Sequence, residues 1–501
     1  MMRDNINFET LKPQAEKLSK NDTPDEINSI LQASCDLGAI ERRQLRTIIK
    51  DKTGISFEDQ KKAQAEYFSK IEVNEDHLTS ARKVINGIGF NNILSTDAHV
   101  WLWRKLGIWQ SIPDRELKQI VQDDLEKHSE DVMRSLVDGV TDVLKTDIFR
   151  PEHTWNWSQD SINVLNGELH RNGEDWELQP HCREHYLTTQ IPVTFDPDAK
   201  CLRFSKFLDE IFVNDPDGGA KARALLEMIG YSLTCDTRFE RFVILIGIGA
   251  NGKSVLMEVL RLLAGSKNVA AVQPCQFDNK FQRAHLHLKL VNLVTEIAEG
   301  AEIADAELKA IVSGELITAE HKHKPPFDFR PYATCWFGTN HMPHTRDFSD
   351  ALFRRALIVP FNRTFKVGVD ADPDLKEKLA EELPGILNLA LQAYGEALKR
   401  GSFTDPESCL RAKEEWRIEA DQAAQFICDR CELVPDARVI SSDLYYAYKN
   451  WADEAGITRR LNRKNFTSRL LRLGAQLCKG KRGIRMIAGI LLKSLGQDDR
   501  Y

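Results

Sequence analysis

Residues 247–254, GIGANGKS, are of the types and spacing that hold a nucleotide phosphate. Glycines let backbone N–H groups curl around phosphate oxygens without a Cβ clash. Lys253 would place a cation on the β- and γ-phosphates, and Ser254 would offer a hydroxyl to Mg²⁺. We therefore expect ATP and Mg²⁺ as cofactors. The predicted nucleotide-binding residues are Gly247, Gly249, Asn251, Gly252, Lys253 and Ser254.

The flanking residues suit a phosphate loop. The apolar run RFVILI before it predicts a buried strand, and a helix is expected over residues 254–264. Such a helix directs the positive end of its dipole at a bound anion. The alternative, a glycine-rich turn without a ligand, fits this context less well.

Two further strands are predicted to end in polar residues that a phosphate site requires. The pattern KLVNLVTEIAEG predicts a strand over 290–295 followed by Glu296, which would hold Mg²⁺ and polarise the attacking water. Glu299 is a weaker candidate for the same cluster. The strand in ATCWFGTN ends at Asn340, which would orient the water. The alternatives are a strand that happens to end in Glu and a cap or turn Asn.

Two basic segments could also interact with phosphate charge. Arg354 and Arg355 precede a strand in SDALFRRALIVPF, and an arginine of this kind stabilises transition-state charge, often from a neighbouring subunit. The segment ITAEHKHKPPFDFR predicts a hairpin tipped with Lys322, His323 and Lys324, which would contact a phosphate backbone. An ordinary arginine pair and a solvated loop are the respective alternatives.

The elements that position these residues suggest a multidomain α/β chain. Residues 1–80 are predicted helical, with Thr23 capping a helix and Gly54 ending the next. Residues 81–225 are expected to form a mixed domain with short strands around an Asn-Gly turn. Residues 226–400 alternate apolar strands with helices, which favours a layered α/β domain, and residues 401–501 form a last domain.

The last domain is predicted to be a winged helix. A first helix opens with a Ser442 cap and shares one face among Leu444, Tyr448, Trp451 and Ala455; a second carries Phe466, Leu470 and Leu473, and a strand, basic turn and strand follow. Residues 459–493 hold eleven Lys or Arg and no Asp or Glu in a chain of net charge −7. A solvated basic helix is the alternative to DNA binding. The predicted DNA contacts are Arg463, Lys464, Arg469, Arg472, Lys479, Lys481 and Arg482.

Taken together, these motifs resemble the superfamily 3 helicases, the compact ring-forming AAA+ motors of small viruses, phages and plasmids. The resemblance is closer to the phage and plasmid helicase–primases, which are related to the poxvirus helicase–primase. It is carried by GIGANGKS, VNLVTEIAEG, LKAIVSGELITAEHKHKPPFDFRP, TNHMP and DALFRRALIVPF, and weaker likeness upstream and downstream extends it over roughly residues 85–493.

The resemblance implies an AAA+ P-loop ATPase core with helical or mixed N-terminal domains and a C-terminal winged helix. It implies Lys253 and Ser254 for nucleotide and metal, Glu296 for water activation, Asn340 as sensor, and Arg354 or Arg355 acting in trans. It also implies a homohexamer encircling DNA. One departure is Glu320, which stands where many relatives have an arginine before the hairpin.

A primase centre is not expected in this chain. Pro197 between Asp196 and Asp198 makes that D-x-D pair a turn. The CDRC at 428–431 lacks a second pair, and neither it nor HCREH at 181–185 is expected to bind zinc. Priming would then come from a separate primase or from host replication proteins.

We therefore expect an ATP-dependent replicative helicase of a phage, prophage or plasmid that acts on single-stranded and forked DNA. The alternative is an ATP-switched origin-binding regulator or loader that does not unwind. The chain lacks a membrane-length apolar run, an N-terminal secretion signal, an LSGGQ-like motif and an N-K-x-D guanine motif, and its ten cysteines are scattered. A cytoplasmic location without membrane contact is expected.

Overall fold

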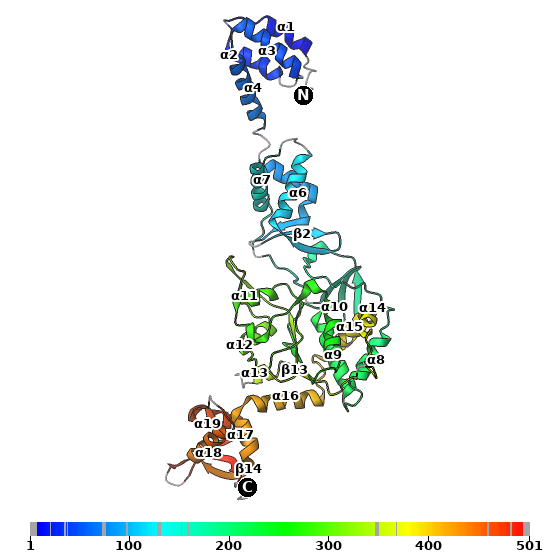
Figure 1. Cartoon of the computed structure of the whole chain (residues 1–501), viewed down its shortest axis with the longest axis vertical. Helices are drawn as coiled ribbons and strands as arrows, with labels where there is room; N and C mark the ends of the chain where they lie inside the picture. Colours follow the sequence, from blue (N-terminus) through cyan, green and yellow to red (C-terminus); the bar gives the residue numbers. More distant parts are fainter. Residues whose placement is uncertain are drawn as a thin grey trace. The chain divides into compact units, whose positions relative to one another are not determined.

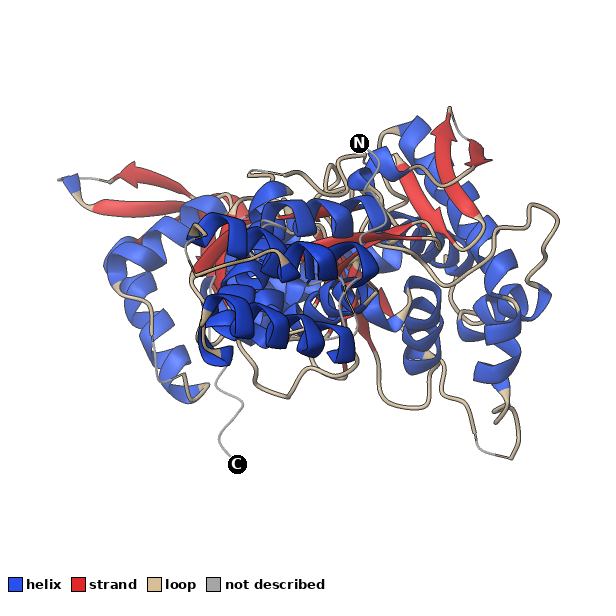
Figure 2. Cartoon of the chain, turned by 90° about the horizontal axis from the view of Figure 1, so that it is seen from above, coloured by secondary structure: helices blue, strands red, loops and turns tan. Residues whose placement is uncertain are grey.

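The computed structural model describes residues 8–20, 22–34, 37, 39–72, 77–96, 99–127, 132–151, 153–158, 160–173, 175–345, 350–366, 368–457, 460–480 and 483–493. The chain divides into two compact units, one of residues 1–102 with 111–153 and one of residues 103–110 with 154–501 (Figure 1). Both helices and strands are abundant (Figure 2). No helix among the described residues is long and apolar enough to span a bilayer, and every described cysteine is free.

The first unit begins with four helices: α1 Phe8–Glu16, α2 Pro24–Ala33, α3 Ala39–Thr53 and α4 Phe57–Glu72. The predicted start of α2 is confirmed, because Thr23 and Glu26 form a reciprocal capping box and Pro24 occupies the first helical position. Gly54, with φ +79°, follows the end of α3 as predicted.

A second group of helices in this unit surrounds its own apolar cluster, which includes Val84, Leu117 and Val140. The group comprises α5 His77–Ile88, η2 Phe90–Asn92, α6 Asp114–Glu126 and α7 Arg134–Asp147. Strands β1 Ile93–Ser95, β2 Val100–Arg104 and β3 Ile108–Ile112 form one sheet, and residues 103–110 of that sheet are assigned to the second unit.

The second unit opens with the antiparallel sheet β4-β5-β6, formed by β4 Ser161–Val164, β5 Gly167–Asn172 and β6 Asp175–Gln179. The turn between β4 and β5 consists of residues 165 and 166, one position before the predicted Asn-Gly pair, because Val164 pairs with Gly167. The next elements are η3 Arg183–His185, α8 Leu202–Ile211 and α9 Gly218–Ser232.

A five-stranded parallel sheet follows, in the order β13-β7-β12-β9-β8. Its strands are β7 Phe242–Ile246, β8 Val269–Ala270, β9 Val291–Val294, β12 Thr334–Thr339 and β13 Ala356–Pro360. The associated elements are α10 Lys253–Ala264, η4 Ser266–Asn268, η5 Pro274–Gln276, α11 Lys280–Arg283, η6 Ala284–Leu286, α12 Asp305–Val312, β10 Ile317–Glu320, β11 Pro326–Phe329, α13 Asp350–Phe353, α14 Leu375–Glu381 and α15 Leu383–Arg400.

Two separate apolar cores cover the two faces of this sheet. Along β7, Val243 and Leu245 belong to one core, whereas Phe242 and Ile244 belong to the other. This alternation follows from the two-residue period of a strand, and burial on both faces explains why β7 is apolar throughout. The first core also contains Ile162 and other residues of 154–225. The predicted boundaries at 80, 225 and 400 stay predictions.

The C-terminal part begins with α16 Glu407–Ala420 and α17 Gln422–Arg430. It continues with β14 Cys431–Ile440, α18 Ser441–Glu454, α19 Arg463–Arg472, β15 Gln476–Lys479 and β16 Arg485–Leu492. The sheet order is β14-β16-β15. The two strands predicted on either side of the basic turn are β15 and β16, and β14 adds a third strand beside β16.

Two details of α18 differ from expectation. The helix starts at Ser441 with Ile440 at the cap position, so Ser442 is not the cap. Its buried face contains Leu444, Tyr448 and Trp451 as predicted, but continues with Ala452, whereas Ala455 is exposed. The reason for the exposure of Ala455 is that α18 ends at Glu454, so Ala455 is the cap residue beyond the last helical turn.

Candidate functional site

The predicted phosphate loop connects β7 to α10 at the carboxyl end of the parallel sheet. Gly252 takes φ +92°, and a Cβ there would lie 2.7 Å from the Cγ2 atom of Ile211, so both backbone and space require glycine. Gly249 has no atom within 4 Å of such a Cβ. Ala250 also adopts a left-handed φ of 52°. The loop is therefore a tight, packed turn with a solvent-facing middle.

Lys253 directs its ammonium back across this loop. The Nζ atom contacts the carbonyl oxygen of Gly247 and lies 3.3 Å from Asn251 Oδ1 and 3.5 Å from Asn340 Oδ1. The residue is only 7 % exposed. Burial lowers the pKa of Lys253 from its ordinary value, and the charge of Glu296 opposes that shift. A desolvated cation thus stands among oxygen acceptors at the start of α10.

The first turn of α10 is arranged to meet an anion. Ser254 is exposed there, directly after Lys253. The helix has Gly252 as its cap residue, which offers no side chain to its first N–H groups. Asn251 Oδ1 accepts from the Lys253 N–H at 3.4 Å. The amino end of a helix with few capping acceptors favours negative charge.

Parallel pairing brings the two predicted polar residues to the same edge. Strand β12 pairs with β7 up to Thr339 and Ile246, and with β9 up to Phe337 and Val294. Asn340 therefore follows the strand beside the loop, and Glu296 follows the next strand. Both side chains are exposed. Glu296 is also near enough to Lys253 to influence its pKa, so the three residues form one cluster.

Two residues that support this cluster were not predicted from the sequence. A Cβ on Gly338 would lie 2.4 Å from the carbonyl oxygen of Thr295, the residue before Glu296. Gln273 donates through Nε2 to the Glu296 carbonyl oxygen at 3.2 Å. A glycine inside the apolar strand pattern of β12 was the available signal, because such a glycine often marks a close backbone approach.

Arg354 and Arg355 are not brought to this cluster. They precede β13, whose Ala356 pairs with Phe242 at the start of β7, so they lie at the opposite edge of the sheet. Arg355 is 8 % exposed and bonds to Ser313 Oγ at 2.9 Å and Glu240 at 2.5 Å. The Arg354 side chain is 64 % exposed, with Glu240 at 3.5 Å. Neither guanidinium therefore reaches the loop of its own chain.

The predicted hairpin is present as β10 and β11, joined by residues 321–325. Lys322, His323 and Lys324 are exposed at its tip, where His323 has φ +64°. At the base of the hairpin, the ring of His321 stacks on the ring of Phe327, with 5.2 Å between the ring centroids. Glu320 forms an ion pair with Lys280 at 2.5 Å, which balances the negative charge just before the basic tip.

A basic groove of about 770 Å³ lies between α19 and the strands β15 and β16. Its cationic lining is Arg463, Lys464, Lys479 and Arg485, with Thr467 and Ser468 between them. Arg485 was not among the predicted DNA contacts, because the strand pattern around it is apolar.

Arg469 and Arg472, which were also predicted to contact DNA, do not line the groove. Arg472 is exposed outside the groove lining. Arg469 is directed to Asp421, with Nη1 at 3.3 Å, and both side chains are largely buried. Lys481 and Arg482 lie outside the described residues.

The chain is similar to known proteins over separate parts of its length. Residues 73–213 match the family D5 N terminal like, and residues 245–355 match a family of unknown function, DUF5906. The second match includes the loop, Glu296, Asn340 and both arginines.

One curated relative, "Putative helicase L207/L206" of Acanthamoeba polyphaga mimivirus, is 26 % identical over 259 residues. That match covers 45 % of this chain and 26 % of the relative, so the chain spans about a quarter of the relative's length.

Two solved structures are similar in outline. One, entitled "The A form apo structure of NrS-1 C terminal region-CTR", has 11 % identity and a TM-score of 0.47, and covers 81 % of this chain and 98 % of its own. A second, "The apo structure of NrS-1 C terminal region (305-718)", has 10 % identity and a TM-score of 0.46 with the same coverage.

Proposed function

We propose that this protein is an ATP-dependent replicative DNA helicase of a phage, prophage or plasmid. The observation that carries the proposal is the convergence of Lys253, Asn340 and Glu296 at the carboxyl ends of three adjacent parallel strands. Ligands of open α/β sheets bind at this edge. The name of the mimivirus relative and the match to the D5 N terminal like family support the choice of a helicase among nucleotide-driven enzymes.

The residues at the loop fit ATP and Mg²⁺. Backbone N–H groups of residues 247–252 and the ammonium of Lys253 would hold the phosphates, and Ser254 with Glu296 would hold Mg²⁺ through hard oxygen ligands. When bound, the metal neutralises charge on the phosphate oxygens. Lys253 stabilises the same charge from the side of the loop, and its burial strengthens that interaction because little water screens it.

Glu296 and Asn340 would act on the water. In the proposed reaction the exposed carboxylate of Glu296 orients a water molecule and accepts its proton, while the amide of Asn340 fixes the line of approach. The bond that forms joins the water oxygen to the γ-phosphorus, and the bond that breaks joins that phosphorus to the bridging oxygen of ADP.

Arg354 is the better candidate for a residue that acts in trans. It is exposed at the edge of the sheet away from its own loop, whereas Arg355 is buried and bonded within its subunit. We therefore propose a ring of identical subunits, a homohexamer, in which Arg354 of each completes the site of its neighbour.

DNA would be contacted at two places. Lys322, His323 and Lys324 present cations on a hairpin suited to a single strand within the ring. Arg463, Lys464, Lys479 and Arg485 line a groove on the C-terminal fold formed by α17, α18, α19 and the sheet β14-β16-β15, which suits a winged-helix contact with duplex or forked DNA. A separate primase or host proteins would supply primers.

The basic groove also suits a second function. An ATP-switched protein that binds an origin through this groove and does not unwind DNA would need the nucleotide site and the C-terminal surface, but not a moving hairpin. The two functions differ in what the hairpin cations do.

The test combines ATP hydrolysis, with and without single-stranded DNA, and strand displacement on a fork. Lys253→Ala should reduce hydrolysis by at least about 100-fold, because one preorganised charge at the phosphate is removed. Glu296→Gln should bind ATP and fail to turn it over. Normal turnover by Lys253→Ala would refute the nucleotide site.

The double variant Lys322→Ala with Lys324→Ala separates the helicase from the regulator. A helicase should keep its basal hydrolysis and lose DNA stimulation and unwinding. If the wild type hydrolyses ATP at a rate that DNA does not change and displaces no strand, the regulator is the correct function.

A further inference from the structure

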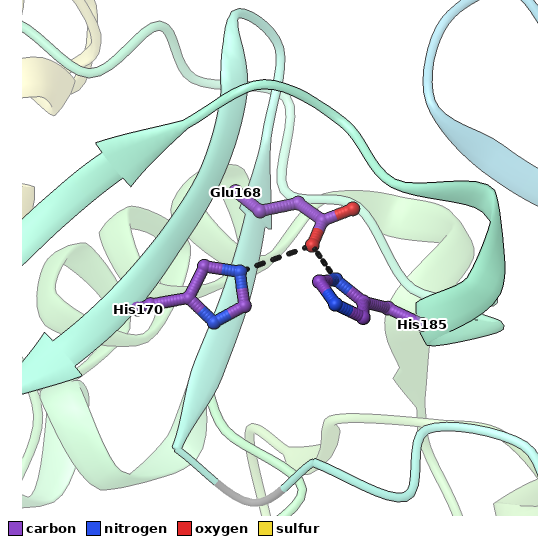
Figure 3. A group of neighbouring side chains, drawn as sticks. All are labelled: Glu168, His170 and His185. Atoms are coloured by element: carbon purple, nitrogen blue, oxygen red, sulfur yellow. Dashed lines mark hydrogen bonds and ion pairs between the residues drawn. The ribbon is translucent and has the colours of Figure 1, made fainter.

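A second cluster of chemically active side chains lies outside the nucleotide site, on the antiparallel sheet β4-β5-β6. Glu168 and His170 stand two residues apart on β5, so they share one face of the strand. His185, the last residue of η3, approaches them from the segment that follows β6. Figure 3 shows the two imidazoles directed at the same carboxylate.

The distances within this cluster are short. Glu168 Oε2 lies 2.5 Å from His185 Nδ1 and 3.2 Å from His170 Nε2. The ligand atoms of all three side chains lie within 4.8 Å of one another. Donors around a tetrahedral zinc ion lie roughly 3.3 Å apart, given bonds of about 2.0–2.2 Å. Small rotations of the imidazoles would therefore bring all three donors into a common coordination sphere.

The charge of Glu168 is unusual for its surroundings. The side chain is completely buried, at 0 % exposure, and its ion-pair partners among the described residues are the two histidines alone. Its other oxygen, Oε1, accepts from the backbone N–H of Cys182 at 2.7 Å. A completely buried carboxylate whose neighbouring ligand groups are imidazoles would gain a full countercharge from a divalent cation.

The surroundings suit a metal site. The Cys182 N–H fixes the orientation of the carboxylate, as groups behind metal ligands commonly do. Trp157 packs edge-on against His185. The side chains of His170 and His185 are 22 % and 27 % exposed, which leaves a path for water as a fourth ligand.

We propose that Glu168, His170 and His185 bind a divalent transition-metal ion of the zinc class. Two imidazoles and one carboxylate favour zinc over Mg²⁺, which prefers oxygen ligands, so the site is chemically distinct from a nucleotide–magnesium site. On binding, each neutral imidazole coordinates through the nitrogen that faces Glu168 and carries its proton on the other ring nitrogen.

The bound ion would fasten residues 181–187 to the sheet. This segment already contacts Trp109, whose Nε1 donates to the Arg183 carbonyl at 2.9 Å and whose ring stacks on Tyr186 at 5.6 Å. The ion therefore acts as a structural cross-link within the second unit. The HCREH segment by itself does not predict this site, because its partners are the Glu-x-His pair of β5, and Glu168 is separated from His185 by 17 positions.

The test uses the full chain, stripped of metal by a chelator and titrated with Co²⁺ and then Zn²⁺ without nucleotide. We expect one equivalent of Co²⁺ with visible d–d absorption, displaced by Zn²⁺ and unaffected by excess Mg²⁺. His170→Gln and His185→Gln should each weaken Co²⁺ affinity at least about 10-fold. Zn²⁺ should raise the Tm of the wild type and not that of these variants.

Matched controls make the result specific. His181→Gln alters a histidine of the same segment that bonds to the Val164 carbonyl instead, and it should bind Co²⁺ like the wild type. Lys253→Ala should also bind normally, which separates this proposal from the nucleotide site. A wild-type protein that takes up no Co²⁺, or variants at 170 and 185 that bind as tightly as the wild type, would overturn the assignment.

Discussion

The ammonium of Lys253 lies 3.5 Å from the side-chain oxygen of Asn340, although the two residues are 87 positions apart. Parallel pairing of β7 with β12 produces this proximity, because both residues follow strands that end at the same edge. A phosphate held by Lys253 would replace the carbonyl and amide oxygens that now surround its Nζ atom. Asn340 would then be released to bond elsewhere in the site.

The two neighbouring arginines should behave differently. Arg354→Ala should change the free energy of unfolding by less than about 0.5 kcal/mol, because the side chain is exposed, yet it should greatly reduce ATP hydrolysis. Arg355→Ala should cost about 1–3 kcal/mol, because it removes a buried guanidinium together with its bonds to Ser313 and Glu240. Thermal unfolding and hydrolysis of both variants provide the measurement.

Mixing Arg354→Ala with Lys253→Ala subunits tests the trans arrangement. Each variant lacks a different half of a shared site, so mixed assemblies should regain part of the activity that neither has alone. Absence of any recovery in assemblies shown to be mixed would argue against trans action.

The basic groove should account for most of the salt-dependent DNA affinity of the C-terminal part. Replacing both Arg463 and Lys464 by Ala should weaken binding and reduce the slope of log K against log salt by about 0.9 for each phosphate that the protein no longer neutralises. Arg469→Ala is the matched control: it breaks the pair with Asp421, so it should lower the Tm and leave the slope unchanged. Equal slopes for wild type and the double variant would contradict this role.

ATP affinity should fall at alkaline pH. Burial lowers the pKa of Lys253 below the ordinary 10.5, so the folded protein binds this proton less tightly than the unfolded chain does. Stability from this group therefore rises with pH between the lowered pKa and 10.5, whereas phosphate binding, which needs the ammonium, weakens across the same window.

The measurement is the Kd for ATP and the Tm at pH values spaced from neutral to about 10. Lys253→Arg keeps its charge over this range and should show a much flatter dependence. A wild-type affinity that stays constant to the top of the range would contradict the prediction.

Gly338 should control the position of Glu296. Gly338→Ala would place a methyl group 2.4 Å from the Thr295 carbonyl oxygen, and the backbone before Glu296 would have to move. We expect hydrolysis to fall at least about 10-fold with ATP binding retained, because the carboxylate and not the loop is displaced. Ala at Gly219 in α9, which has open space for a Cβ and lies outside the loop, should leave hydrolysis unchanged and serves as the control.

The sequence was most informative where structure is local. The capping box of Thr23 and Glu26, the turn after β7 and the strand before Asn340 depend on neighbouring residues, and all are present. Continuous apolar runs also predicted the strands of the parallel sheet, because both its faces are buried.

Contacts between distant segments were not predictable in this way. No local pattern shows that Asp421 neutralises Arg469, or that β14 joins β16 to complete the last sheet. The separation of Arg354 from Arg355 into an exposed and a buried residue depends on Glu240 and Ser313, which lie far off in sequence.

The packing of α16 has a mechanical consequence. Trp416 is 1 % exposed, donates to the Pro343 carbonyl at 2.9 Å and contacts the ring of Phe353, the residue directly before Arg354. Asp350, at the start of α13, pairs with Arg417 at 3.0 Å. In the proposed ring, force applied to Arg354 by another copy of the chain would reach α16 through the contact between Phe353 and Trp416. Only Asp421 separates α16 from α17.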